Sequence, residues 1–180
     1  MGACFEHVKE CWAQSIKGNH DDNVFGNSVE VVSARPGRAE LRMKVEERHL
    51  NGHGNVHGGV VMTLVDDVTW LGMQTLGLPK VGSVSTNISC EFVRPSGRLG
   101  DYLHMVSEPV KIGRRLAFLR ITFYDKNGEV CAYGTQTVAV LGDPTFTHKF
   151  SADGSVLVPV PKDDKKKGEL LPSTEAKGKL

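Results

Sequence analysis

NGHGNVHGG, residues 51–59, runs directly into the apolar segment VVMTLVDDVTWLGMQTL, residues 60–76. Apolar side chains recur in the second segment at helical spacing, so they predict one long helix over residues 57–76, ended by Gly77. The glycines of the first segment leave unpaired backbone N–H groups at the start of that helix, where they can bind a carbonyl or an anion. Asp66 adds a carboxylate farther along. Together these are the groups that an acyl-transfer site requires.

Strand-like runs stand on both sides of this helix. Before it, residues 29–34 and 38–45 alternate around Arg35-Pro36-Gly37, which predicts a β-hairpin. After it, four runs separated by turn residues predict four more strands, at residues 82–94, 101–111, 115–124 and 130–141. The expected fold class is therefore α+β, with an antiparallel sheet wrapped around one long central helix.

The chain divides into three parts. Apolar residues recur at helical spacing within residues 4–16, so the segment 1–24 is expected to form a short N-terminal helix and a loop that packs on the main domain, residues 25–142. The last segment, 143–180, contains a charged run, several prolines and few aromatic side chains, so it is expected to be mostly disordered. Within it, residues 156–160 could still add an edge segment or dock on a neighbour.

Composition excludes several classes of function. The formal net charge is only +1, so nothing in the charge balance indicates a nucleic-acid partner. The four cysteines lie far apart, and no apolar run reaches the roughly 18 residues of a membrane helix. We expect a soluble cytoplasmic protein. The end, Gly178-Lys179-Leu180, differs by its glycine from the peroxisomal Ser-Lys-Leu signal, so a mitochondrial or peroxisome-like organelle is the alternative.

The predicted helix has two stripes at about 100° per residue. The first is apolar and is expected to pack on the sheet: Val61, Leu64, Val65, Val68, Leu71, Gly72 and Thr75. The second is displaced from it by a third of a turn or more: Met62, Asp66, Thr69 and Met73. Asp66 is therefore expected to face away from its own sheet, on a surface covered by a second subunit. The neighbouring Asp67 fits a solvated position better.

His57 and Asp66 are nine positions apart, so on one helix they point in nearly opposite directions. If they share a site, it must be built across a subunit interface, with the helix start from one chain and Asp66 from the other. Two simpler interpretations compete. A structural turn would also use Gly and Asn, and His49, His53 and His57 have a spacing that would suit zinc on a helix, although the intervening glycines disfavour a helix there.

The motif Asn51, then His57-Gly58-Gly59 after five residues, then Thr63-Leu64-Val65-Asp66, resembles the hotdog-fold acyl-CoA thioesterases, in particular the PaaI-like and acyl-CoA thioesterase 13 group. The resemblance runs from about residue 25 to residue 142. Two further pieces match: residues 85–95 are similar to the family strand that ends in an aromatic residue, an arginine and a proline, and residues 111–117 are similar to its basic loop.

The resemblance implies a hotdog fold that hydrolyses fatty acyl-CoA to free acid and CoA. It implies a homodimer or a dimer of dimers with sites at the subunit interface. By this resemblance Asp66 activates or orients the attacking water, and the Gly58 N–H forms half of an oxyanion hole. Asn51 holds the carbonyl or the water, and His57 assists near the thioester. CoA is part of the substrate, so no separate cofactor and no metal are expected.

Further residues complete the expected site. Ser85 and Asn87 share one strand parity, so we expect both to point toward the substrate, together with Gly59 at the helix start. The CoA phosphates need cations, which a short basic turn and the end of the preceding strand could supply. The expected CoA-binding residues are Lys111, Gly113, Arg114, Arg115, Arg94 and Pro95. The alternative for the turn is a solvated basic hairpin.

Two other functions fit the same residues. A non-catalytic acyl-CoA-binding or scaffold protein would keep the basic turn without needing Asp66. An enoyl-CoA hydratase would use the same fold, but it typically needs an Asp and a His close together on one chain, which the spacing of His57 and Asp66 disfavours.

Overall fold

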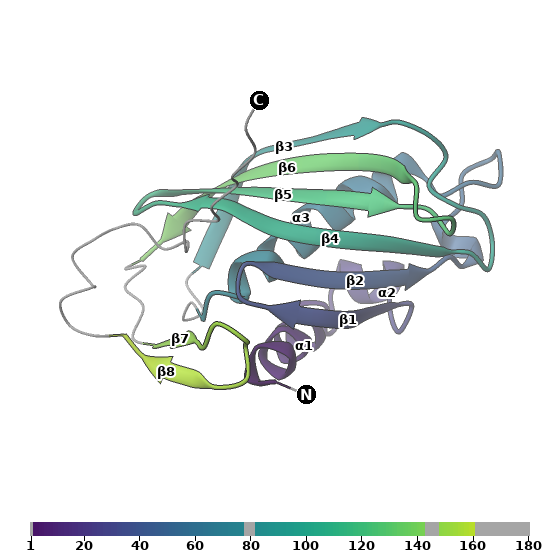
Figure 1. Cartoon of the computed structure of the whole chain (residues 1–180). Coiled ribbons are helices and arrows are strands. Elements are labelled where there is room, and N and C mark those ends of the chain that lie inside the picture. Colours follow the sequence, from purple (N-terminus) through teal and green to yellow (C-terminus); the bar gives the residue numbers. More distant parts are fainter. Residues whose placement is uncertain (1, 78–81, 143–147, 161–180) are drawn as a thin grey trace, which may run out of the picture.

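A computed structural model of the chain describes residues 2–77, 82–142 and 148–160. Its main sheet has six antiparallel strands in the order β1-β2-β4-β5-β6-β3 (Figure 1). The strands are β1 (Val29–Arg35), β2 (Arg38–Lys44), β3 (Gly82–Phe92), β4 (Tyr102–Ile112), β5 (Leu116–Tyr124) and β6 (Val130–Leu141). The predicted α+β fold, an antiparallel sheet with one long central helix and a short N-terminal helix, is confirmed.

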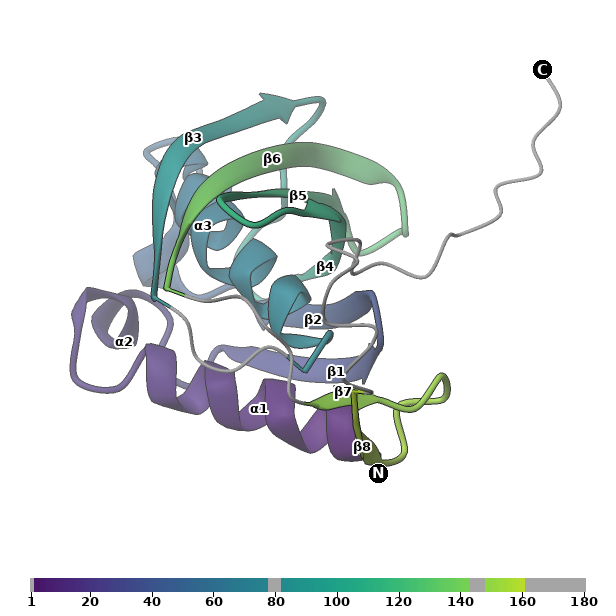
Figure 2. The same cartoon turned by 90° about the vertical axis from the view of Figure 1, so that its left-hand side faces the viewer.

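The central helix α3 (Gly58–Gln74) lies in the hollow of the curved sheet (Figure 2). The residue before it, His57, is the N-cap: its Nδ1 accepts a hydrogen bond from Gly59 N. The helix ends before Gly77, which has a φ of +79°, a value that glycine adopts without steric cost. The helix also approaches β4 closely, since a Cβ on Gly72 would lie 2.2 Å from Ser107 Oγ.

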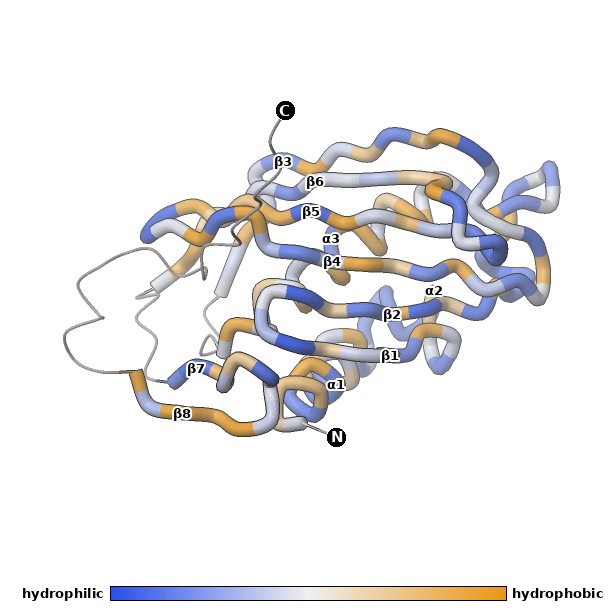
Figure 3. The backbone as a smooth tube through the Cα atoms, viewed as in Figure 1, coloured by the Kyte–Doolittle hydropathy of each residue, from blue (hydrophilic) through white to orange (hydrophobic). Residues whose placement is uncertain are grey.

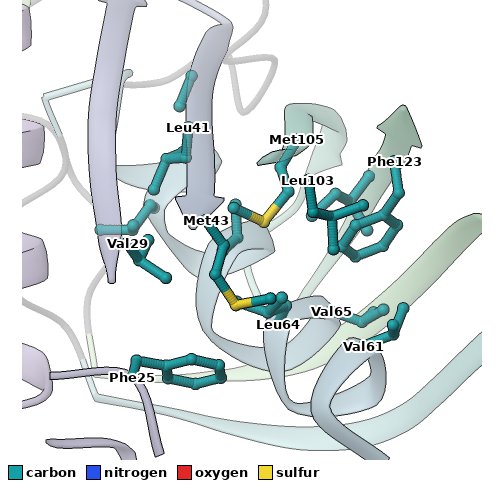
Figure 4. Packing of buried hydrophobic residues seen from close by; sticks show 14 of the residues in the cluster. Phe25, Val29, Leu41, Met43, Val61, Leu64, Val65, Leu103, Met105 and Phe123 are labelled. Carbon is teal, nitrogen blue, oxygen red and sulfur yellow. The ribbon is translucent and has the colours of Figure 1, made fainter. Parts of the chain in front are cut away.

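The first stripe of α3 packs as predicted. All seven of its residues are buried, and Val61, Leu64 and Val65 join a core with Leu103 and Phe123 from the sheet (Figure 4). Hydrophobic and hydrophilic residues alternate along the strands (Figure 3), so one set of side chains turns inward: those of β2 to β6 toward α3, and those of β1 toward α1. Burying this apolar surface is the main stabilising contribution to the fold.

The second stripe of α3 corrects a prediction. Thr69 and Met73 are fully buried, and Met73 packs in a second core cluster with Ile112 and Leu119 of the sheet. The cause is the curvature of the sheet, which wraps around more of the helix than one face (Figure 2). The prediction from helical periodicity assumed a flat sheet that contacts one face of the helix. It therefore placed the second stripe at an interface with another subunit.

Two short elements precede the sheet. The predicted N-terminal helix is α1 (Ala3–Ser15), and the loop after it contains a further helical turn, α2 (His20–Val24), which the sequence did not indicate. A 3-10 turn, η1 (Glu47–His49), leads from β2 toward α3. Helix α1 packs against β1 and α3 and buries Val8 and Trp12. None of the helices in the described part of the chain is long and apolar enough to cross a membrane.

The C-terminal segment differs from the expectation of disorder over residues 148–160. There β7 (His148–Phe150) and β8 (Leu157–Pro159) pair as a separate antiparallel hairpin beside the start of α1 (Figure 1). The backbone N–H groups of Ala3 and Cys4 donate to Ser155 O at 3.1 Å and to Gly154 O at 3.0 Å. The hairpin is thus ordered because it satisfies helix-end donors and buries Phe150. The rest of the expected disordered tail, residues 143–147 and 161–180, lies outside the described residues.

Candidate active site

Asp66 forms a polar cluster with two strands of its own sheet. Ser85 Oγ of β3 donates to Asp66 Oδ1 at 2.8 Å. Gln136 Nε2 of β6 donates to the same oxygen and also to Ser85 Oγ, at 2.9 Å in the second case. The expectation that Asp66 faces away from its sheet is therefore wrong. Asp66 remains partly exposed, so solvent can still reach the carboxylate.

The sequence analysis did not identify Gln136 as a site residue. Only 2% of its surface is exposed, and it occupies an inward position of β6 between buried neighbours on the same face, Gly134 and Val138. A long polar side chain at an inward position of an alternating strand is unusual, because a buried polar group needs a partner. That break in the pattern was a usable signal, although the sequence could not reveal Asp66 as the partner.

Asn87 does not join this cluster. A β-bulge shifts the pairing of β3 with β6, so that Ser85 lies opposite Val138 but Asn87 lies opposite Thr137. Val138 is a core residue, whereas the neighbouring Ser89 bonds the exposed Thr135 on the outer face. Strand parity predicted one direction for Ser85 and Asn87, but the extra residue of the bulge turns them to opposite faces.

Asp67 was predicted to be solvated, but the structure places it in a largely buried position. Burial, with smaller contributions from the charges of Asp21 and Asp66, raises its pKa to about 7. Its Oδ2 atom is buried and has no hydrogen-bond partner among the described residues. The helix face that carries Asp67 is therefore covered by protein, because α1 crosses it and Cys11 of α1 lies against Gln74.

The start of α3, with the backbone N–H of Gly58, is the second part of the candidate site. Gly58 is the first helical residue, so no carbonyl within the helix can accept from its N–H. The Gly59 N–H, by contrast, donates to His57 Nδ1 at 2.8 Å. The ring of Phe92, at the end of β3, lies close to Gly58: a Cβ there would be 3.4 Å from Phe92 Cζ. Phe92 is itself 53% exposed.

Asn51 anchors the loop before α3. Its Oδ1 accepts from His53 N at 2.9 Å and from Asn55 N at 3.3 Å, and its backbone pairs with Asn55 and Gly54. These bonds use the carbonyl oxygen of the side chain. The amide nitrogen of Asn51 has no partner among the described hydrogen bonds, so it can donate to a ligand.

The Asp66 cluster and the start of α3 lie apart within one chain. Ser85 touches Asp66 near the beginning of β3, whereas Phe92 touches Gly58 at the end of the same strand. Seven residues of strand span about 23 Å. The structure therefore brings Asp66 and Ser85 together, and Gly58 near Phe92, but it does not join these two groups in one chain.

The expected CoA-binding residues also divide into two groups at opposite ends of the sheet. Gly113, which closes the β4–β5 turn by donating to Leu116 O at 2.8 Å, lies with Lys111, Arg114 and Arg115 at the left end in Figure 1. The three basic side chains are exposed and form no ion pair with a described residue. Arg94 and Pro95 follow β3 at the other end, and Arg94 pairs with Glu129.

The histidines of the loop are not gathered for a metal. His49 is buried, its Nδ1 accepts from Glu46 N at 3.0 Å, and its Nε2 lies 2.8 Å from Val24 O. Burial lowers its pKa. In residues 2–77, 82–142 and 148–160, no three His, Cys, Asp or Glu side chains stand close enough together to hold a metal ion.

Comparisons with known proteins give the family. The model of the thioesterase superfamily matches residues 53–132 of this chain. Acyl-coenzyme A thioesterase 13 of Homo sapiens is 32% identical over 140 residues, which cover 76% of this chain and 96% of that protein.

Solved structures agree with that assignment. Thioesterase superfamily member 2 from Mus musculus superimposes with a TM-score of 0.67 at 28% identity, covering 79% of this chain and 100% of that one. A hypothetical thioesterase from Streptococcus pneumoniae TIGR4, solved with coenzyme A, has a TM-score of 0.62 at 30% identity and covers 71% of this chain and 98% of its own. With the antiparallel sheet curved around α3, these matches mean that the chain belongs to the thioesterase superfamily and is a thioester hydrolase of the hotdog fold.

Proposed function

We propose that the chain hydrolyses fatty acyl-CoA to free acid and CoA in a homodimer, or a dimer of dimers, whose sites combine residues of two subunits. The observation that carries the proposal is the separation of the two polar groups. The eight residue steps along α3 from Gly58 to Asp66 span about 12 Å along the helix axis. A water in contact with its base must lie about 3 Å from the carbonyl carbon that it attacks. Within one chain, Gly58 and Asp66 are therefore too far apart to act on the same thioester carbonyl.

The edge strand supports a way to close this gap. Among the described residues, β3 pairs with β6 alone, so its other edge presents backbone groups along Gly82–Phe92 that no described strand pairs with. Antiparallel pairing of β3 with β3 of a second copy, about a two-fold axis near the middle of the strand, reverses the second strand. Ser85 and Asp66 of one copy then come beside the end of β3 and Gly58 of the other.

In the proposed chemistry each of these site residues has one role. Asp66 takes a proton from a water, whose oxygen attacks the thioester carbonyl carbon. The Gly58 N–H and the Asn51 amide donate to the oxyanion that forms. As the carbonyl re-forms, the C–S bond breaks, and the CoA sulfur leaves as a thiolate that takes up a proton, with His57 near the thioester to assist. No step uses a metal or a separate cofactor.

The same pairing assembles the cations. Lys111, Arg114 and Arg115 of one copy come to the end of the sheet where the second copy carries Arg94 and Pro95. Since the three residues of the turn have no carboxylate partner among the described residues, they are available to CoA phosphates. Arg94 already pairs with Glu129, so we assign it the smaller contribution.

The experiment that tests the activity is release of the free CoA thiol from short, medium, long and aromatic acyl-CoAs. We expect turnover by the wild type and a loss of at least about 100-fold in kcat for Asp66→Ala. The control is Glu10→Ala, an exposed residue of α1. A wild type that is inert on every thioester would exclude the proposed function, and an active Asp66→Ala variant would exclude its mechanism.

Subunit mixing tests the shared site. Asp66→Asn and Asn51→Ala are each expected to be inactive alone. When they are unfolded and refolded together, half of the dimers are mixed, and each mixed dimer holds one intact site of two. We therefore expect about a quarter of the wild-type activity to return. If both groups act within one chain, mixing restores nothing.

A further inference from the structure

Thr69 and Gln136 form a buried pair behind Asp66. The Thr69 hydroxyl donates to Gln136 Oε1, and Gln136 Nε2 donates forward to Asp66 Oδ1 and Ser85 Oγ. Thr69 is fully buried and Gln136 is 2% exposed. Water therefore cannot replace either partner, and the orientation of the Gln136 amide depends on the protein.

The direction of these bonds determines which atom of the amide faces Asp66. An amide has a donor end and an acceptor end, and only the NH₂ end is attracted to a carboxylate. The Thr69 hydroxyl satisfies the other end, Oε1, which would otherwise be a buried acceptor without a partner. The same hydroxyl also lies 3.3 Å from the Asp66 backbone carbonyl, which is the longer of its two hydrogen-bond contacts.

The consequence falls on the geometry of the carboxylate. Asp66 Oδ1 accepts two hydrogen bonds, from Ser85 and Gln136, whereas no described residue donates to Oδ2. Two donors on one oxygen fix the rotation of the carboxylate and leave the second oxygen for a ligand. A carboxylate held only by Ser85 could rotate about its bond to Cβ.

We propose that Gln136 is a positioning residue for the catalytic base, that Thr69 acts through it by orienting the amide, and that Asp66 Oδ2 is the oxygen that binds the attacking water. This inference rests on the proposed function, because it assigns the supporting residues of the same site. Neither Thr69 nor Gln136 touches the substrate in this assignment.

Steady-state kinetics on acyl-CoA test the pair through a double-mutant cycle. Gln136→Met keeps the size and removes both bonds, so we expect kcat to fall about 10- to 100-fold with KM unchanged within about twofold. Thr69→Val is isosteric and removes only the donor, with an expected loss of about 3- to 10-fold in kcat. Thr69→Ser restores the hydroxyl and is expected to return kcat to near the wild-type value.

The double variant distinguishes positioning from packing. If Thr69 acts through Gln136, adding Thr69→Val to Gln136→Met lowers kcat no further. Independent losses that multiply, or single variants with lower melting temperatures but unchanged kcat, would overturn the inference. If Gln136→Met fails to fold, the comparison of Thr69→Val with Thr69→Ser decides alone. An inactive wild type would refute the proposed function, whereas an active wild type with normal Thr69→Val turnover refutes only this inference.

Discussion

Ser85 and Asp66 share a hydrogen bond of 2.8 Å across 19 residues of sequence, from an edge strand to the central helix. The bond depends on the bulge at residue 86, which turns Ser85 inward while Asn87 and Ser89 face outward. A serine at the beginning of β3 is thereby directed at the one carboxylate that the family resemblance makes the base. The bulge is therefore part of the candidate site, although it lies in a strand that looks regular in sequence.

Ser85→Ala is the first test of this bond. Removing the hydroxyl leaves Gln136 as the only described residue that donates to Asp66 Oδ1, so we expect kcat to fall about 10-fold with a small change in KM. Ser89→Ala is the matched control, because Ser89 belongs to the same strand and bonds Thr135 on the outer face. Thiol release with both variants checks the prediction, and equal activities would contradict it.

The fold was predictable because its signals are local. Helical spacing within residues 57–76 and alternation within the strands depend only on neighbours in sequence, and each element appears near its expected position. The site was less predictable because it depends on curvature and register. Asp66 meets its own sheet because the sheet curls around α3, and Asn87 leaves the site because of one extra residue in β3. Neither event leaves a mark in the local pattern.

Asn51 combines two tasks that one substitution can separate. Its Oδ1 holds the loop through His53 N and Asn55 N, while its amide nitrogen bonds no described residue and is available to the oxyanion. Asn51→Asp keeps the acceptor and removes the donor. We expect a melting temperature close to that of the wild type and a kcat lower by about 100-fold or more, because a carboxylate repels the developing negative charge.

Asn51→Ala is the companion variant, since it removes both the donor and the loop anchor. It should lose activity and also stability, by about 1 kcal/mol. Calorimetry and thiol release on the two proteins separate the tasks. An Asn51→Asp variant that unfolds as easily as Asn51→Ala would mean that the loop, rather than the oxyanion, needs the amide.

Asp67 makes the stability of the fold depend on pH. Its pKa is about 7 in the folded protein and near the ordinary 3.8 when unfolded. Between these values the folded state holds a proton that the unfolded state has lost, so stability falls as pH rises from about 4 to about 7 and is level above that. Asp67→Asn cannot ionise, so relative to this variant the wild type should lose about 4 kcal/mol across that window, since each unit of pKa corresponds to about 1.4 kcal/mol.

Urea unfolding of both proteins at several pH values measures this difference. Glu10→Gln, at an exposed position of α1, controls for a general effect of removing one carboxylate. Curves that stay parallel for the wild type and Asp67→Asn between pH 4 and pH 7 would show that Asp67 reaches water in the folded state.

The docked hairpin offers a test with a closely matched control. Gly154 has a φ of +73°, and a Cβ there would lie 3.2 Å from both Cys4 Cβ and Pro36 Cδ. Gly128 has a φ of +78° with no atom within 4 Å of such a Cβ. Gly154→Ala and Gly128→Ala therefore carry the same backbone strain of about 1 kcal/mol, and only the first pushes the hairpin away from α1.

We expect Gly154→Ala alone to speed hydrogen exchange at the Ala3 and Cys4 amides, which donate to the hairpin. Equal exchange at these two amides in both variants would mean that α1 keeps its first turn without the hairpin.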